Sequence, residues 1–301
     1  MGSNYLQGVN DGFGLPATLP AGVAQLASTL IDAEIKRPEG LIYTKDGNGN
    51  PCAMASMTPS FTYKLGSAIT PGTNVVVTVT PANIRADSIG EVLVLDFANP
   101  AAVEACVIVA VNGTNQITLG NVQFSHASGA LADVGRVISE DRTTPSKRSI
   151  VRVAKFPLVS VVSMLGRYSY GRRSDQVGGL YQDMNLLASI QSFGGPPPWI
   201  PIAIPPSSWS DATGEIWVPA GELLSYYSDV RIKYVAGYPT VPDPVARAAA
   251  QIASGLIQTS NLSGGLQRIT AGDTTMMRFA ATTLDNDVKK LLDPFRARTT
   301  F

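Results

Sequence analysis

The residue types that carry most enzyme chemistry are scarce in this sequence. It contains one histidine, His126, and two cysteines, Cys52 and Cys106, which form no Cys-x-x-Cys pair. One histidine excludes zinc sites that are built from several histidines, and the wide separation of the cysteines disfavours a mixed cysteine–histidine site. We therefore expect no metal, and we interpret both cysteines as reduced thiols in apolar surroundings.

Catalysis by a serine–histidine–aspartate triad would have to use His126, which lies in a Gly/Ser-rich stretch. No Gly-x-Ser-x-Gly nucleophile motif accompanies it. The sequence also lacks a Gly-x-x-x-x-Gly-Lys-Ser/Thr phosphate loop and a dinucleotide fingerprint after a strand. Nothing favours a pair of acids for glycoside hydrolysis over ordinary surface charges. We expect His126 to be a structural hydrogen-bonding residue, and we expect neither enzymatic activity nor a cofactor.

The stretch Asp46–Asn50 resembles the start of a calcium-binding loop. Its spacing fails, because Pro51 takes the position of the loop glycine and Met57 the position of the bidentate acid. Its glycines and asparagines are typical of a turn, which is the better interpretation.

The composition of the chain narrows the function classes further. Of its 301 residues 45% are hydrophobic and 15% are charged, and its 23 Lys and Arg balance its 23 Asp and Glu. A dedicated nucleic-acid-binding protein usually has a basic excess, which is missing here, although a neutral wall past which DNA slides is compatible with this composition. No apolar window has the length of a membrane span, and residues 1–14 lack the features of a secretory signal.

The secondary structure predicted to position these residues changes along the chain from helix to short strands. An amphipathic helix is predicted over 18–37. Short strands bounded by Gly, Asn, Pro and Asp recur over 60–140, which predicts a small barrel or sandwich inserted into the chain. The expected strands cover 61–65, 75–80, 91–97, 103–111, 116–119 and 136–140.

A proline-rich loop over 194–206 follows a second strand-rich region at 148–170. Its prolines predict extended backbone outside regular sheet and helix. Trp199, Ile200 and Trp209 lie in or near this loop. They are candidates for contact with a neighbouring subunit or a tail protein, and packing on their own domain is the alternative.

Residues 228–260 predict a strand, a turn and a helix in succession. At the start, apolar and charged residues alternate, which is typical of an edge or surface-facing antiparallel strand. The apolar set is Val230, Ile232 and Tyr234. Gly237 ends the strand, because glycine adopts positive φ without strain.

A helix with almost no charge is predicted over 244–259, with Asp243 as its N-cap. Arg247 is its only charged residue, whereas a surface helix usually has a charged face. The helix must therefore be covered on nearly all sides, either as the central helix of one domain or by sharing its faces with a neighbouring subunit. The candidate interface residues are Val245, Ala249, Ala250, Ala253 and Leu256.

Two motifs, in this order, resemble the head–tail connector (neck adaptor) proteins of tailed bacteriophages. The first is Tyr234-Val235-Ala236-Gly237-Tyr238, followed by a proline and the Ala-rich helix. The second is Leu291-Leu292-Asp293-Pro294-Phe295-Arg296, at the end of a last helix predicted over 284–295. Together with the first helix and with the segments 156–161 and 214–219, the resemblance covers most of the chain outside 60–140.

The resemblance implies an α+β fold with a helical-bundle connector core, antiparallel β elements and an inserted all-β domain. We place the first part of the core at 1–58, the inserted β-barrel-like domain at 59–145 and the second part of the core at 146–301. Compact members of the family lack the β module, whose role is unassigned.

The resemblance further implies a structural virion protein in the neck of the particle, made in the cytoplasm of the bacterial host. Such proteins form a closed ring, commonly of twelve subunits, between the portal and the next neck or tail protein. The ring encloses the DNA channel without reading the DNA sequence and without a membrane partner. The C-terminal segment often docks into the portal, and a disordered free tail is the alternative. The corresponding residues are Phe295, Arg296, Arg298 and Phe301.

Two other classes stay open. A receptor- or carbohydrate-binding virion protein of the tail or fibre would use the β module together with Trp199 and Trp209. A cell-wall-degrading enzyme of the tail is the weaker rival, because the sequence offers no catalytic set for it.

Overall fold

A computed structural model describes most of the chain, and it divides into two compact units. The first unit comprises residues 1–63 and 237–297, and the second comprises 64–236 and 298–301. The three-part domain division given above remains a prediction. The described residues are 5–6, 14–16, 18–43, 63–82, 84, 88–99, 101–144, 149–167, 198–205, 208–219, 227–260, 268–271, 274–277 and 285–298.

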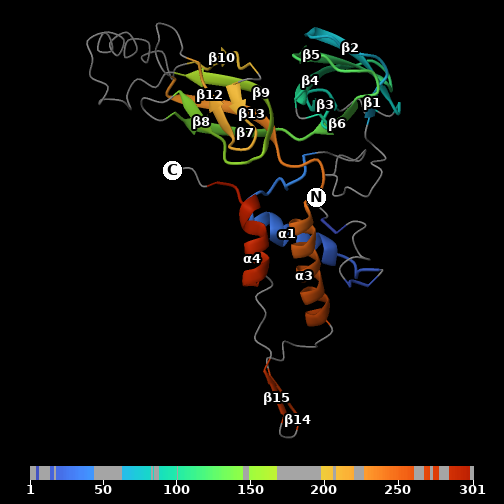
Figure 1. Ribbon diagram of the computed structural model, residues 1–301, viewed down its shortest axis with the longest axis vertical. Helices are drawn as coiled ribbons and strands as arrows, with labels where there is room; N and C mark the ends of the chain where they lie inside the picture. Colours follow the sequence, from blue (N-terminus) through green and yellow to red (C-terminus); the bar gives the residue numbers. More distant parts are fainter. Residues whose placement is uncertain are drawn as a thin grey trace, which may run out of the picture. The chain divides into compact units, whose positions relative to one another are not determined.

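The α+β class with a helical-bundle core is wrong. The described residues are mostly β, with a closed six-stranded barrel and three short α-helices (Figure 1). The cause lies mainly in residues 150–236, which we assigned to the connector core. In the described part of this range the apolar residues recur with the period of a strand, and they form sheets.

The first unit contains the three helices and a short 3-10 turn. The helices are α1 (Val23–Glu34), α3 (Asp243–Ser260) and α4 (Asn286–Leu292), and the turn is η5 (Asp293–Phe295). Helix α3 packs against both α1 and α4. Their apolar stripes share one core, which contains Ile31 of α1, Ala249 of α3 and Val288 of α4.

The second unit holds a closed barrel with the strand order β1-β2-β5-β4-β3-β6. Its ends join where the Leu65 amide donates to the Ala130 carbonyl, 3.0 Å away. In the last strand expected for the module, 136–140, residues 138–140 do form a strand, but they belong to another sheet, and 131–135 closes the barrel instead. The barrel strands are β1 (Tyr63–Leu65), β2 (Gly72–Thr80), β3 (Val92–Leu95), β4 (Glu104–Val111), β5 (Gln116–Val122) and β6 (Leu131–Gly135).

The second unit contains two further sheets (Figure 1), which share an apolar core. A four-stranded sheet has the order β10-β9-β13-β7, and a three-stranded sheet has the order β11-β12-β8. Their strands are β7 (Ile138–Thr143), β8 (Ile150–Arg152), β9 (Leu158–Arg167), β10 (Ile200–Ile202), β11 (Trp209–Ser210), β12 (Glu215–Trp217) and β13 (Asp229–Ala236). In the first unit, β14 (Arg268–Ala271) and β15 (Thr274–Met277) form a hairpin between α3 and α4.

Strand β13 is antiparallel as predicted, but it is not an edge strand. It pairs with β9 on one side and β7 on the other. Val230, Ile232 and Tyr234 are fully buried, while Lys233 on the opposite face is exposed. The alternation therefore reports one solvated face of a central strand, which antiparallel sheets commonly have.

The proline-rich loop is partly sheet, which corrects the expectation that it lies outside regular structure. Ile200–Ile202 pairs with Gly166, Leu165 and Met164 of β9 as an edge strand. Pro201 is tolerated there because an edge strand needs a donor from only alternate residues. Residues 194–197 lie outside the described part of the chain.

Candidate interaction surfaces

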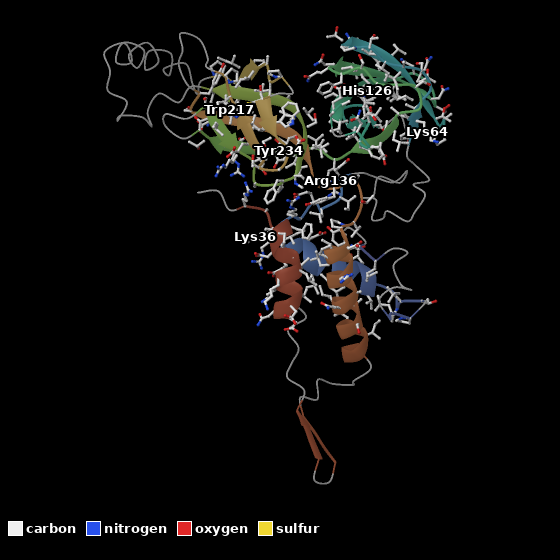
Figure 2. All side chains as sticks on the ribbon, in the orientation of Figure 1. Lys36, Lys64, His126, Arg136, Trp217 and Tyr234 are labelled. Carbon is white, nitrogen blue, oxygen red and sulfur yellow. The ribbon has the colours of Figure 1, made fainter. Side chains whose placement is uncertain are left out.

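The two candidate chemical residues that the structure describes, His126 and Cys106, belong to the barrel. His126 is buried there (Figure 2) and its Nε2 is 2.7 Å from Glu104 Oε1. Cys106 is buried on β4, and burial, then the Glu104 charge, raises the pKa of its thiol. Cys52 lies outside the described residues. Among the residues that the structure describes, no three His, Cys, Asp or Glu side chains are grouped to hold a metal.

The residues predicted to form a subunit interface on α3 face the core of their own unit. Val245, Ala249 and Ala253 are fully buried, Ala250 is 3% exposed, and all four belong to the helical core. Leu256 is partly buried against the same core. Their burial therefore needs no neighbouring subunit, although the predicted interface itself stays a prediction.

The turn after β13 brings two distant segments of the first unit together. Gly237 has a φ of 123°, and a Cβ on it would overlap the Leu41 carbonyl oxygen. The Tyr238 amide donates to that carbonyl at 3.0 Å, and the Tyr43 amide donates to the Tyr238 carbonyl at 3.2 Å. Only glycine allows the backbone to approach this closely with a positive φ.

The segment that follows α4 contacts the turn at Gly237 and Tyr238. The Phe295 ring is buried and meets the Tyr238 ring edge to face, with centroids 5.7 Å apart. Arg296 forms ion pairs with Glu34 of α1 and with Asp293. The Ala297 amide donates to the Ile35 carbonyl at 2.8 Å. Two residues predicted to dock into a portal, Phe295 and Arg296, are thus engaged within their own unit.

Arg298, the third predicted docking residue, belongs to the second unit. Its guanidinium lies 4.3 Å from the centre of the Phe156 ring and donates to the Thr213 carbonyl at 2.7 Å. Its amide donates to the Ala154 carbonyl at 2.8 Å. Phe301 lies outside the described residues, and the docking role of all four residues stays a prediction.

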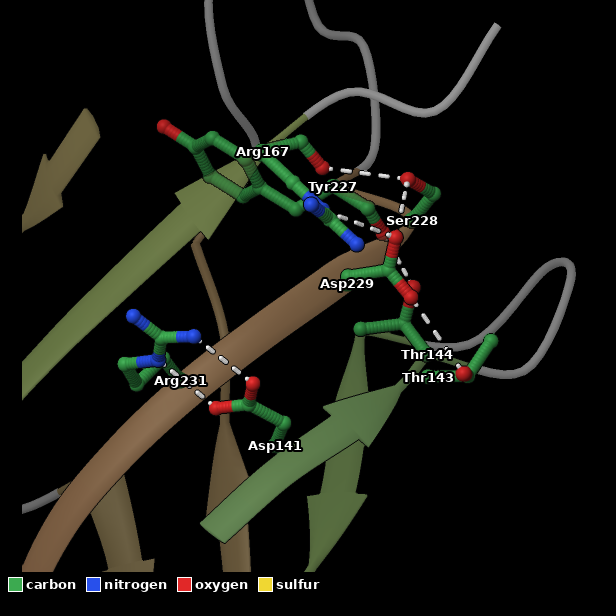
Figure 3. A network of polar contacts seen from close by, with 8 residues as sticks. All are labelled: Asp141, Thr143, Thr144, Arg167, Tyr227, Ser228, Asp229 and Arg231. Carbon is green, nitrogen blue, oxygen red and sulfur yellow. Dashed lines mark hydrogen bonds and ion pairs between the residues drawn. The ribbon is translucent and has the colours of Figure 1, made fainter. Parts of the chain in front are cut away.

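The solvated face of the four-stranded sheet carries an arginine–tryptophan cluster. The guanidinium carbons of Arg167 and Arg231 lie 4.7 and 4.6 Å from the centre of the Trp199 ring. Arg231 pairs with both Asp141 oxygens at 2.8 Å, and Arg167 Nε donates to Asp229 at 3.2 Å (Figure 3). The hydrogen bond from Arg231 lowers the pKa of Asp141 below its ordinary value.

Asp229 is held by several donors at the end of this sheet. Ser228 Oγ and Thr143 Oγ1 donate to its two carboxylate oxygens at 3.4 and 3.3 Å (Figure 3). Arg167 is thereby placed beside Trp199 by a carboxylate that is itself positioned by hydroxyl groups. Charged and aromatic groups of this kind suit a protein interface more than an active site.

The three tryptophans differ in how far their rings are open to a ligand. Trp199 is covered by two guanidinium groups, and Trp209 packs against the core of the second unit. Ile200 is half-buried on β10. Trp217 on β12, which sequence reasoning did not single out, is 58% exposed. The available signal for its exposure was its position next to Ile216, because neighbouring residues of a strand face opposite sides of the sheet.

The barrel wall also presents apolar side chains that the sequence reasoning missed. The signal was present, because β2 and β4 carry apolar residues at successive positions, Val75–Val77 and Val107–Val109, and therefore on both faces. Strands β2 and β4 both pair with β5. The exposed residues are Val76 on β2, Val107 and Val109 on β4, and Ile89 in the segment before β3.

Comparison with known proteins identifies no relative. No family model matches the sequence, and no curated protein matches it significantly. In the part of the chain described here, no helix is long and apolar enough to cross a membrane.

Proposed function

We propose that this protein is a structural virion protein, a head-to-tail adaptor that forms a ring between the portal and the next neck or tail protein. Its role is geometric and needs no catalysis. The DNA passes through the ring without sequence recognition, for which a formal net charge of zero is suitable because it leaves little attraction to phosphates.

The convergence of the two resemblance motifs in one place is the observation that carries this proposal. Tyr238 belongs to the strand–turn–helix motif and Phe295 to the closing motif, and their rings are in contact. Arg296 of the closing motif pairs with Glu34 of the first helix. Residues that matched the adaptor pattern separately are therefore parts of one packed unit, as expected if the pattern reflects a common architecture.

A ring requires an apolar surface that a neighbouring protomer can cover. Leu26 on α1 is 49% exposed and lies on the helix that the proposal places between protomers. The half-buried Leu256 on α3 is the member of the predicted interface set that retains exposed surface. We therefore assign the ring contact to the outer sides of α1 and α3, with the alanines of α3 supporting it from inside.

The test is the mass in solution of the full chain, measured alone and after mixing with the portal protein. A ring under either condition is expected. Leu26→Glu should shift the mass toward the monomer while leaving the circular dichroism spectrum unchanged. Gln25→Glu, which adds the same charge at the neighbouring exposed position, should leave the ring intact. A monomer under both conditions, with no binding to the portal, would contradict the proposal.

A second candidate function is a receptor- or carbohydrate-binding virion protein of the tail or fibre. The exposed ring of Trp217, which flanks the Arg152–Glu215 ion pair on the same sheet, favours it. Aromatic faces beside polar groups are suited to sugar rings. A change of tryptophan fluorescence on adding cell-surface glycans, lost in Trp217→Phe and kept in Trp209→Phe, would support this candidate. An unchanged spectrum with every glycan would remove it.

A further inference from the structure

His126 lies between two carboxylates inside the barrel. Its side chain is fully buried, with Nε2 2.7 Å from Glu104 Oε1 and Nδ1 3.6 Å from Asp96 Oδ2. Nδ1 has no hydrogen-bond partner among the described residues. Both ring nitrogens therefore face negatively charged groups, away from water.

Glu104 is fixed as a carboxylate by its other contacts. Its two oxygens accept hydrogen bonds from the amides of Gln123 and Phe124, at 2.8 and 3.0 Å. Both oxygens accept hydrogen bonds from backbone N–H groups, a set of contacts that favours the acceptor-only, ionised form. The contact with His126 then needs a proton on Nε2.

The His126 ring cannot turn away easily, because its backbone is held on both sides. The His126 amide donates to the Ile69 carbonyl at 3.0 Å, and the Ile69 amide donates to the His126 carbonyl at 2.9 Å. Asp96 is also fixed. Its φ is 54°, and its amide donates to the Leu131 carbonyl at 2.7 Å.

A neutral imidazole satisfies only one of these two carboxylates. With the proton on Nε2, the lone pair of Nδ1 would face Asp96 in a buried place without any donor, and an unpaired buried polar atom is destabilising. An imidazolium has N–H donors on both nitrogens, so it matches Glu104 and Asp96 together.

We propose that His126 is a buried imidazolium that bridges Glu104 and Asp96 and fastens this end of the barrel. Two other buried titratable groups on the described barrel strands are Cys106 on β4, whose thiol hydrogen-bonds to Glu104, and Asp133 on β6, whose Oδ1 accepts from the Val134 amide at 2.8 Å. Neither supplies a positive charge, so loss of the proton leaves two carboxylates without a cation between them.

The bridge ties the segment 123–126 to the start of β4 and to the turn after β3. This device is independent of the proposed adaptor function.

The decisive measurement is ¹⁵N NMR of the ring nitrogens of the full chain without a histidine tag. The chain has one histidine, so the spectrum reports His126 alone. At neutral pH we expect both nitrogens to show protonated, imidazolium shifts. The pattern of a neutral tautomer, with one protonated and one bare nitrogen, would overturn the proposal.

Substitutions then distinguish the effect of the bridging carboxylate from that of a change in net charge. In Asp96→Asn the Nδ1 proton should be lost at the same pH, because the second carboxylate is gone. Asp287→Asn, which removes an exposed carboxylate in the other unit, should leave both proton signals in place. If Asp96→Asn does not fold, the spectrum of the unsubstituted protein still decides. Retention of both protons in a folded Asp96→Asn would contradict the bridge.

Discussion

The rings of Tyr238 and Phe295 meet edge to face, with 67° between their planes. Tyr238 follows the glycine turn after β13, and Phe295 ends the turn after α4. This contact joins the start and the end of the segment 237–297, which belongs to the first unit. Burial raises the pKa of the Tyr238 hydroxyl. The positions of both residues in the adaptor-like motifs are thus explained by one packing contact.

A double-mutant cycle should show that the contact between the Tyr238 and Phe295 rings stabilises the fold beyond the burial of their apolar area. We expect Tyr238→Leu and Phe295→Leu to be coupled by about 0.5–1.5 kcal/mol, the range typical of aromatic pairs. The coupling is measured from the free energies of unfolding in urea. Strictly additive effects of the two substitutions would mean that the rings do not meet in solution.

Gly237→Ala should be among the most damaging single-methyl changes in the chain. The added Cβ would overlap the Leu41 carbonyl, and the positive φ of 123° disfavours alanine besides. We expect a loss of at least about 2 kcal/mol in the free energy of unfolding. The matched control is Gly255→Ala in α3, where a Cβ meets nothing within 4 Å and alanine should stabilise the helix by up to about 1 kcal/mol.

Ala250→Leu should destabilise the fold itself, because Ala250 is buried in the core of its own unit. Overpacking of this kind typically costs about 1–3 kcal/mol. Gln251→Leu, at the adjacent exposed position of the same helix, should change the free energy of unfolding little. A stable Ala250→Leu protein that fails only to assemble would show that Ala250 lies at a subunit interface instead.

The ion pair between Arg231 and Asp141 should contribute little to the free energy of unfolding, and only above acidic pH. Both side chains are largely exposed, so Asp141→Asn should lose less than about 1 kcal/mol at neutral pH. Because the pKa of Asp141 is lowered in the fold, its contribution is present above the ordinary value of 3.8 and disappears as the pH falls below that value. Urea unfolding at several pH values, with high salt as a control, tests this. An equal deficit at acidic and neutral pH would contradict it.

Local patterns predicted individual elements better than they predicted the architecture. The helix expected over 244–259 corresponds to α3, because its cap and its apolar spacing are local signals. The alternation of Val230, Ile232 and Tyr234 indicated an antiparallel strand, but not the two partners that make it central. Partner strands come from distant parts of the chain, and no local pattern encodes them.

The candidate surfaces show the same limit. Trp199 was singled out, yet its arginine neighbours are on β9 and β13 and meet it only through the pairing of β10 with β9. The sequence left open whether the alanines of α3 are covered by their own domain or by a neighbouring subunit, and in the structure they share a core with α1 and α4 of the same unit. His126 was expected to be a structural hydrogen-bonding residue. That interpretation could not include its second carboxylate, because Asp96 is brought to it by the closure of the barrel.

The most direct test of the adaptor proposal is an image of the intact virus particle that locates this chain and counts its copies. We predict a closed ring of identical protomers in the neck, in contact with the portal on one side and with a neck or tail protein on the other. Copies found only on the tail tip or fibres, or a chain that is absent from the particle, would contradict the account.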